Sequence, residues 1–187
     1  MHKEFKKLKE ECLSCEKCEL CKGRRNVVFG VGNPESKVMF VGEGPGEQED
    51  IEGEPFVGKS GQLLDKYLEL MDLDRKDNIY IANIVKCRPP QNRDPKPEEQ
   101  DSCIDYLRRQ VKLIQPKIIV CLGRIAAQRL ISPDFRVTVQ HGQFIEKGGI
   151  LFMGTFHPSA LLRNESNKPE ALKDFQALRD KIKELNL

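Results

Sequence analysis

The sequence predicts a single α/β domain, a three-layer sandwich around a central, mostly parallel sheet. Four apolar runs alternate along the chain with segments of helical periodicity, and this order builds a parallel sheet covered by helices on both faces. The length of 187 residues fits one domain with one core, and no internal repeat is present. The expected domain spans residues 1–187, and its strands are 37–42, 79–85, 117–123 and 150–155.

Each expected strand is a continuous apolar run, which fits a strand that is buried on both faces. Weaker strand signals lie at 136–139 and 143–145. The expected helices carry apolar residues three and four positions apart, as Leu64 and Leu68 do. The helices are expected at 2–11, 61–71, 98–114, 124–131 and 169–185, and loops at 43–54 and 87–97.

Composition excludes several classes of protein. No apolar stretch approaches the roughly 18 residues of a membrane span, and residues 1–7 lack the apolar core of a secretory signal. We therefore expect a cytoplasmic protein without membrane contact. The 31 basic and 29 acidic residues give a net charge of +2, which neither indicates nor excludes binding to nucleic acid.

Residues 53–60, GEPFVGKS, match the phosphate-binding P-loop pattern letter for letter. A P-loop requires a strand directly before the first glycine, but the acidic segment 48–52 stands there and would repel a triphosphate. The sequence therefore disfavours a P-loop NTPase.

Seven cysteines, an odd number, favour metal binding over a disulfide framework in a reducing compartment. Cys87 and Cys103 flank a Pro-rich loop, where burial in a core is a poor explanation, whereas Cys121 lies in an expected strand and reads as a core residue. The residues alone leave an iron–sulfur cluster and zinc both open. The other four cysteines stand at C-x-x-C spacing: Cys12, Cys15, Cys18 and Cys21.

Three motifs follow three of the expected strands, where open α/β sheets bind their ligands. They are GEGPGE at 42–47, CRPPQNR at 87–93 and HPSALLRN at 157–164. In this order, with cysteines upstream, the sequence closely resembles the family 4 uracil-DNA glycosylases, the iron–sulfur type of archaea and thermophilic bacteria. The resemblance runs from about Cys15 to the last expected helix.

The resemblance implies a uracil-DNA glycosylase-like fold and a monofunctional DNA glycosylase that initiates base excision repair. Such an enzyme flips uracil out of DNA and hydrolyses the N-glycosidic bond. The implied partner is uracil-containing DNA, single- or double-stranded, and we expect a monomer.

The resemblance also implies a [4Fe–4S] cluster that ties the N-terminal segment 12–21 to the loop between Cys87 and Cys103. The segment KCRPP places the third ligand at Cys87, and Cys103 fits the fourth. The family register places the first pair at Cys15 and Cys18. The extra cysteines, Cys12 and Cys21, remain alternatives to a member of that pair.

Three residues fit the recognition and release of uracil. The Asn83 amide can donate to uracil O4 and accept from N3–H, a pattern that cytosine reverses. Phe56 can stack on the base, although core packing is the alternative. The resemblance places the histidine that stabilises the uracil anion at His157, where a neutral imidazole N–H would face O2.

The loop after the first strand supplies further candidates. Gly42, Glu43 and Gly44 resemble the uracil-binding loop, and Glu49 matches a position that helps exclude thymine. The best-known uracil glycosylases have an aspartate where this chain has Gly44. Glu43, the nearest carboxylate, is expected to position a water and offset charge on the sugar.

Leu161 and Leu162 are candidate wedges for the gap that a flipped base leaves, with one of the two expected in the core. Candidate phosphate contacts are Arg163, Arg88, Arg93, Lys59 and Lys86. A lyase step would need a lysine as nucleophile, and the three motif loops offer no lysine except Lys86 and Lys59. No lyase step is therefore expected. A non-enzymatic iron–sulfur or zinc protein, in electron transfer or nucleic-acid contact, is the alternative function, and it leaves Asn83, Phe56 and His157 without a task.

Overall fold

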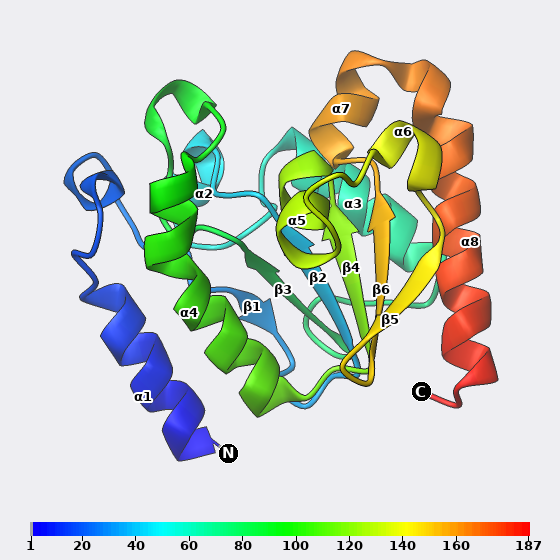
Figure 1. Cartoon of the computed structure of the whole chain (residues 1–187), viewed down its shortest axis with the longest axis horizontal. Coiled ribbons are helices and arrows are strands. Elements are labelled where there is room, and N and C mark those ends of the chain that lie inside the picture. The colour runs from blue at the N-terminus through cyan, green and yellow to red at the C-terminus, as the bar shows by residue number, and fades with distance from the viewer. Residues whose placement is uncertain (1) are drawn as a thin grey trace.

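A six-stranded sheet runs through the centre of residues 2–187, the part of the chain that the computed structural model describes (Figure 1). The strand order is β1-β3-β2-β4-β6-β5. Neighbouring inner strands are parallel, so the mostly parallel sheet is confirmed. These inner strands are β2 (Val38–Gly42), β3 (Ile79–Asn83), β4 (Ile118–Leu122) and β6 (Ile150–Thr155).

The two edge strands are antiparallel to their neighbours. β5 (Phe144–Lys147) pairs with β6 and agrees with the weak strand signal at 143–145. β1 (Val31–Gly32) pairs with β3 and was not expected, because two residues are too short for a periodic signal.

Helices cover both faces of the sheet, which confirms the three-layer architecture (Figure 1). Successive strand residues point to opposite faces, so Met39 and Val41 join one core while Val38 and Phe40 join the other. One face packs against α1 (His2–Leu13), α4 (Pro97–Ile114) and α5 (Arg124–Leu130). The other packs against α3 (Lys59–Glu69), α7 (Pro158–Arg163) and α8 (Lys168–Glu184).

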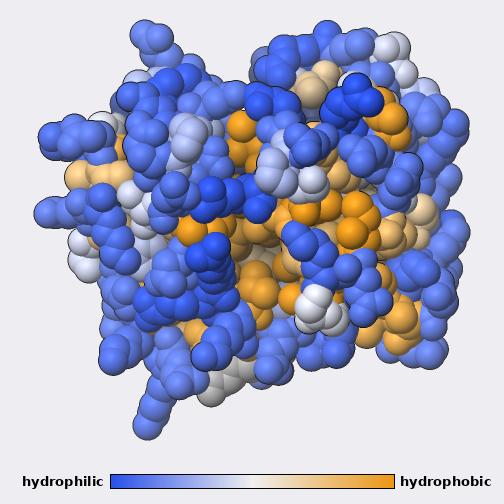
Figure 2. Space-filling model, viewed as in Figure 1, coloured by the Kyte–Doolittle hydropathy of each residue, from blue (hydrophilic) through white to orange (hydrophobic). Residues whose placement is uncertain are grey.

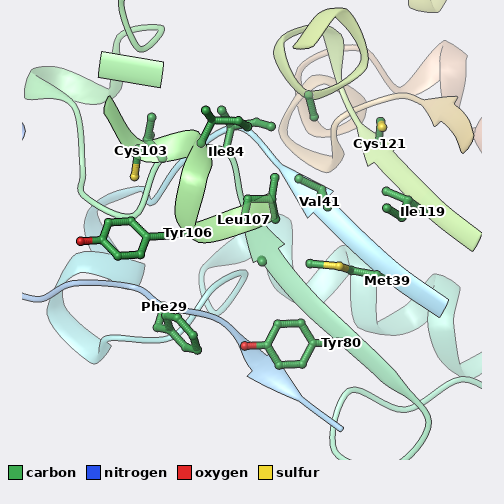
Figure 3. Close-up of a cluster of buried hydrophobic side chains, with 14 of the residues drawn as sticks. Phe29, Met39, Val41, Tyr80, Ile84, Cys103, Tyr106, Leu107, Ile119 and Cys121 are labelled. Atoms are coloured by element: carbon green, nitrogen blue, oxygen red, sulfur yellow. The ribbon is translucent and has the colours of Figure 1, made fainter. Parts of the chain in front are cut away.

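The layer between the sheet and α4 contains several aromatic rings and the buried Cys103 (Figure 3). Phe5 of α1 packs edge-on against Phe29 and Tyr80, at centroid distances of 5.5 and 5.7 Å. Cys121 of β4 is fully buried here, as predicted, and burial raises the pKa of its thiol. On the molecular surface seen from this side, apolar side chains show between hydrophilic ones (Figure 2).

Two expected elements were wrong. Residues 43–54 are not all loop, because α2 (Glu47–Glu52) forms where Glu49 accepts the N–H of Gly46 and caps the helix start. Residues 136–139 do not form a strand. Residues 137–139 instead belong to the helix α6 (Val137–Gln140), and the Gln140 side chain accepts the N–H of Arg136, just before the helix, at 2.8 Å.

Short helical turns complete the described chain. They are 3₁₀ helices η1 (Glu19–Lys22), η2 (Pro90–Asn92) and η3 (Glu165–Asn167). The element directly before Gly53 is the helix α2 and not a strand, which supports the rejection of a P-loop. None of the helices in residues 2–187 is long and apolar enough to cross a bilayer.

Candidate active site

A cleft of about 690 Å³ opens at the carboxyl ends of β2, β3, β4 and β6. Parallel strands end at the same edge of a sheet, so the segments that follow them meet there. Gly42 and Leu161 do not reach the cleft wall. The predicted site residues that line it are Glu43, Gly44, Glu49, Phe56, Asn83, His157, Leu162 and Arg163.

Asn83 is the last residue of β3 and lies at the foot of this cleft with only 2% of its surface exposed. Its Oδ1 atom is buried and has no hydrogen-bond partner among the described residues. A buried acceptor without a partner costs free energy, so its persistence points to a ligand that supplies the donor. Gly42 leaves the room for this side chain, because a Cβ there would lie 2.5 Å from Oδ1.

Phe56 is held in a strained backbone conformation beside Asn83. Its φ angle is +53°, a region that few non-glycine residues occupy, and its ring is buried. Arg75 stabilises this geometry, because its guanidinium donates to the carbonyl oxygens of Pro55 and Phe56 at 2.9 and 2.7 Å. Gly61 is required as well, since a Cβ there would lie 1.9 Å from the Phe56 carbonyl oxygen.

His157 lies between the end of β6 and the start of α7, with its ring centroid 5.5 Å from that of Phe56. Its Nδ1 accepts the backbone N–H of Ser159 at 3.1 Å and lies 2.7 Å from the Ser159 hydroxyl. Burial, with a smaller effect from Arg163, lowers the pKa of His157 to about 4. At neutral pH the ring is therefore neutral, with its proton on Nε2.

Glu43 follows β2 directly and lines the same cleft. Burial raises the pKa of its carboxyl to about 7, and the negative charge of Asp94 contributes to the rise. Arg124 and Arg163 act in the opposite direction. A carboxyl with a pKa near the working pH can both hold and release a proton there.

Glu49 has a structural task in addition to its place on the cleft wall. Its Oε1 accepts the N–H groups of Val57 and Gly58 at 2.9 and 3.0 Å, while Oε2 accepts that of Gly46. The carboxylate thus fixes the loop next to Phe56. Gly44 is needed for packing, because a Cβ there would lie 2.7 Å from the Val85 side chain.

The structure separates the two candidate wedge residues. Leu161 is 1% exposed and packs in the core, so it is not available as a wedge, whereas Leu162 is 42% exposed and lines the cleft. Lys86 is 1% exposed, and its assignment as a phosphate contact was wrong.

The other predicted phosphate contacts differ in their partners. Arg93 and Lys59 line the cleft, although Arg93 also forms an ion pair with Glu99 at 2.7 Å. Arg88 lies outside the cleft wall, where it donates to Asn92. Arg163 faces the cleft and influences the pKa of both His157 and Glu43.

Sequence reasoning missed three residues of the site. Arg124 lines the cleft directly after β4, so the rule that ligands bind at the carboxyl ends of strands could have found it. Ser159 stands in the HPS motif, where its position two residues after His157 was a usable signal. Arg75 gave no signal, because it lies in a charged segment that reads as an exposed loop.

Comparison with known proteins decides the family. Residues 29–181 match the model of the uracil DNA glycosylase superfamily. A type-4 uracil-DNA glycosylase of Archaeoglobus fulgidus is 44% identical to this chain, over 90% of this chain and 88% of its own length. The chain belongs to the type-4 uracil-DNA glycosylases.

Two further relatives allow the type-4 and type-5 families to be compared. A type-4 uracil-DNA glycosylase of Thermotoga maritima is 46% identical over 85% of this chain and 83% of its own length. A type-5 uracil-DNA glycosylase of Pyrobaculum aerophilum is 31% identical over 70% of this chain and 64% of its own length. The type-4 family therefore accounts for more of this sequence than the type-5 family does.

A second cavity in this type-4 family member is lined by six cysteines. They come from the end of α1, the segment around η1, the turn after β3 and the start of α4. Among the described residues, no group of three or more Cys, His, Asp or Glu side chains is arranged to hold a single metal ion. The cysteines that line this cavity, the cysteine pocket, are Cys12, Cys15, Cys18, Cys21, Cys87 and Cys103.

The donors around the cysteine pocket fit a thiolate-bound group. The backbone N–H of Lys86 donates to Cys103 Sγ at 3.2 Å, and Arg24 Nη1 donates to Cys87 Sγ at 3.4 Å. Such hydrogen bonds stabilise a thiolate and tune a cluster that it binds. Burial raises the pKa of Cys103 to about 11 and also raises that of Cys87, so binding must release protons from these thiols.

Proposed function

We propose that this chain excises uracil from DNA as a monofunctional glycosylase. The cleft supports this function through one observation above all: a buried, unpartnered acceptor on Asn83 lies on the same wall as His157 and Phe56. Uracil presents an N3–H donor between two carbonyl acceptors and a flat face. The cleft therefore offers an amide for the polar edge and an aromatic ring for the face.

His157 is proposed to stabilise the leaving base. As the N1–C1′ bond breaks, its electron pair moves to uracil, and negative charge develops on O2. A neutral imidazole that donates a hydrogen bond from Nε2–H stabilises this charge, and the ring does not have to be protonated first. Ser159 supports the role, because its backbone N–H occupies Nδ1 and leaves Nε2 as the donor.

Glu43 is proposed to position the attacking water. Water adds its oxygen to C1′ as the base leaves, and a proton passes from that water to a base or to solvent. The Glu43 carboxylate also offsets positive charge on the sugar. The pKa of about 7 leaves a substantial fraction of this group ionised at neutral pH.

The reaction is proposed to stop at the abasic site. A bifunctional glycosylase–lyase uses an amine nucleophile that forms a Schiff base with the sugar. The Lys86 ammonium is buried and bound to protein acceptors, so it is not available as this amine. Lys59, on the cleft wall at the start of α3, is assigned to a phosphate contact instead of to the sugar. Borohydride should therefore trap no covalent complex with DNA.

We also propose that the cysteine pocket holds a [4Fe–4S] cluster with Cys15, Cys18, Cys87 and Cys103 as ligands. When bound, the cluster would join the N-terminal segment to the turn after β3 and to α4. Support comes from the six convergent thiols and from the hydrogen bonds that Lys86 and Arg24 donate to sulfur. A non-enzymatic iron–sulfur protein would use this pocket and leave the cleft unexplained.

A glycosylase assay tests the proposed function. Purified protein is incubated with oligonucleotides that carry single-stranded U, U·G, U·A or T·G, without added metal or nucleotide. Strand breakage at U that appears only after alkali supports monofunctional excision, and the panel also measures strand preference. An intact brown protein that leaves every uracil in place would contradict the proposal.

A further inference from the structure

Lys86 is a buried cation without an anionic partner. Only 1% of its surface is exposed, and the ion pairs of the described residues include no carboxylate for its ammonium. Burying an unpaired charge is costly, so such a residue calls for a specific compensation. Lys86 lines the cysteine pocket together with Cys103 and Cys12.

The hydrogen bonds of this ammonium point toward the uracil-reading residue. Lys86 Nζ donates to the backbone carbonyl of Asn83 at 3.0 Å and to Gln110 Oε1 of α4 at 2.7 Å. Gln110 in turn donates to the carbonyl of Phe29 and to the Tyr80 hydroxyl. The side chain therefore closes the turn at the end of β3 and anchors it to α4. Figure 3 labels Phe29 and Tyr80, the two partners of Gln110.

The backbone of the same residue reaches the other site. Its N–H donates to Cys103 Sγ at 3.2 Å, and its carbonyl accepts the N–H of Val28 at 2.8 Å. Cys87 is the next residue in the chain. One lysine thus touches the cysteine pocket with its main chain and the last residue of β3 with its side chain.

The turn that Lys86 closes also holds the loop after β2. The N–H groups of Ile84 and Val85 donate to the carbonyls of Gly42 and Glu43 at 2.9 and 3.1 Å. A shift of the turn would therefore move Glu43 and Asn83 together, and both line the cleft.

We propose that Lys86 is a positioning residue that couples the cysteine pocket to the uracil-facing end of β3. Its backbone N–H donates to Cys103 Sγ, and its ammonium holds the Asn83 carbonyl in place. This inference rests on the proposed function for its uracil-facing side and on the bound cluster for the other. If the hydrogen bond of Lys86 to Asn83 or to Cys103 is lost, the geometry of the other site changes as well.

Lys86→Met tests the coupling, because it keeps an unbranched side chain only one atom shorter and removes the charge and donors. Exposed Lys117→Met is the matched control. Three quantities are measured: hydrogen exchange of the segment 83–87, iron retained per chain after a chelator challenge, and single-turnover excision of uracil. We expect exchange in this segment to accelerate, iron retention to fall and excision to slow about 10–100-fold, the usual effect of losing an outer-shell partner.

A double-mutant cycle with Asn83→Ala separates positioning from general destabilisation. If Lys86 acts through the turn that carries Asn83, Lys86→Met slows excision by a smaller factor in the Asn83→Ala background than in the wild-type background. Independent losses that multiply would overturn the proposal. So would exchange and iron retention equal to those of Lys117→Met.

A second variant covers the case in which Lys86→Met does not fold. Gln110→Met keeps the ammonium but removes its side-chain acceptor, and we expect the same three changes at smaller size. Unchanged exchange in 83–87 would contradict the coupling. If the wild type itself excised no uracil, the proposed function would fail, while exchange and iron retention would still decide the structural role of Lys86.

Discussion

The backbone N–H of Ser159 donates to Nδ1 of His157 across the first turn of α7, at 3.1 Å. This bond and the low pKa of about 4 define one form of the histidine at neutral pH, a neutral ring with Nε2–H as its donor. The ring lies 5.5 Å from Phe56 on the cleft wall. A preorganised neutral donor stabilises charge that develops on a leaving base.

His157→Ala is therefore expected to slow single-turnover excision by about 10²–10³-fold, the usual cost of losing a preorganised oxyanion donor. Glu43→Gln should slow it less, since the reaction relies mainly on stabilising the leaving base. Both rates are measured on the same U·G duplex, with thermal melting as the control for folding. The reverse order of the two variants would sink this division of roles.

The pH dependence of excision should report Glu43. Its folded pKa of about 7 lies above the ordinary value of 4.5, so the carboxylate is lost as pH falls through 7. Single-turnover rates should rise with pH up to about 7 and then level off, while Glu43→Gln should lack this limb. Because the pKa of His157 is about 4, its protonation does not interfere above pH 5. A limb that persists in Glu43→Gln belongs to another group.

The same shift predicts an effect on stability. A carboxyl with a raised folded pKa favours the folded state at low pH, and this contribution disappears as pH rises through about 7. Glu43→Gln removes the charge, so it should raise the melting temperature at pH 8 more than at pH 5. Equal changes at both pH values would argue against a desolvated carboxyl at this position.

Arg75→Met should disturb the base-stacking ring without touching the cleft. It removes the donors to the Pro55 and Phe56 carbonyls and the 2.6 Å ion pair with Asp65, so Phe56 loses the contacts that maintain its φ of +53°. We expect slower excision, mainly through a higher KM, and a loss of stability of about 1–3 kcal/mol from unsatisfied buried groups. Exposed Arg108→Met is the control. The effect on KM should vanish in a Phe56→Ala background.

Cysteine variants assign the cluster ligands. Replacing Cys15, Cys18, Cys87 or Cys103 by Ser should reduce the iron content from about four atoms per chain and remove the brown colour. Cys12→Ser and Cys21→Ser should retain the cluster, and Cys121→Ser serves as the buried control outside the pocket. Iron loss from Cys12→Ser or Cys21→Ser, with retention in Cys15→Ser or Cys18→Ser, would reassign the first pair.

The sequence predicted the inner strands because their residues are apolar on both faces, as in Val38–Gly42 and Ile118–Leu122. It missed α2, whose acidic residues lack apolar periodicity and whose start depends on a carboxylate cap from Glu49. It also misjudged α6, where β-branched residues favoured a strand but the Gln140 side chain accepts the N–H of Arg136 across a four-residue helix.

The position of the site followed from chain order, because the three motifs follow β2, β3 and β6, which are parallel strands of one sheet. The contacts that orient the side chains of the site could not be predicted from chain order. The guanidinium of Arg75 donates to the carbonyl of Phe56, 19 positions earlier in the chain, and the Lys86 ammonium donates to Gln110, 24 positions later. No local pattern encodes such long-range contacts, so only the folded chain reveals them.

The central claim is that Asn83 reads uracil at the foot of the cleft. Single-turnover excision by Asn83→Asp on a U·G duplex tests it most directly, with exposed Asn186→Asp as the control. A carboxylate loses the donor to uracil O4 and repels that oxygen, so excision should fall by several orders of magnitude while the fold and iron content persist. A near-normal rate would mean that Asn83 does not contact the base.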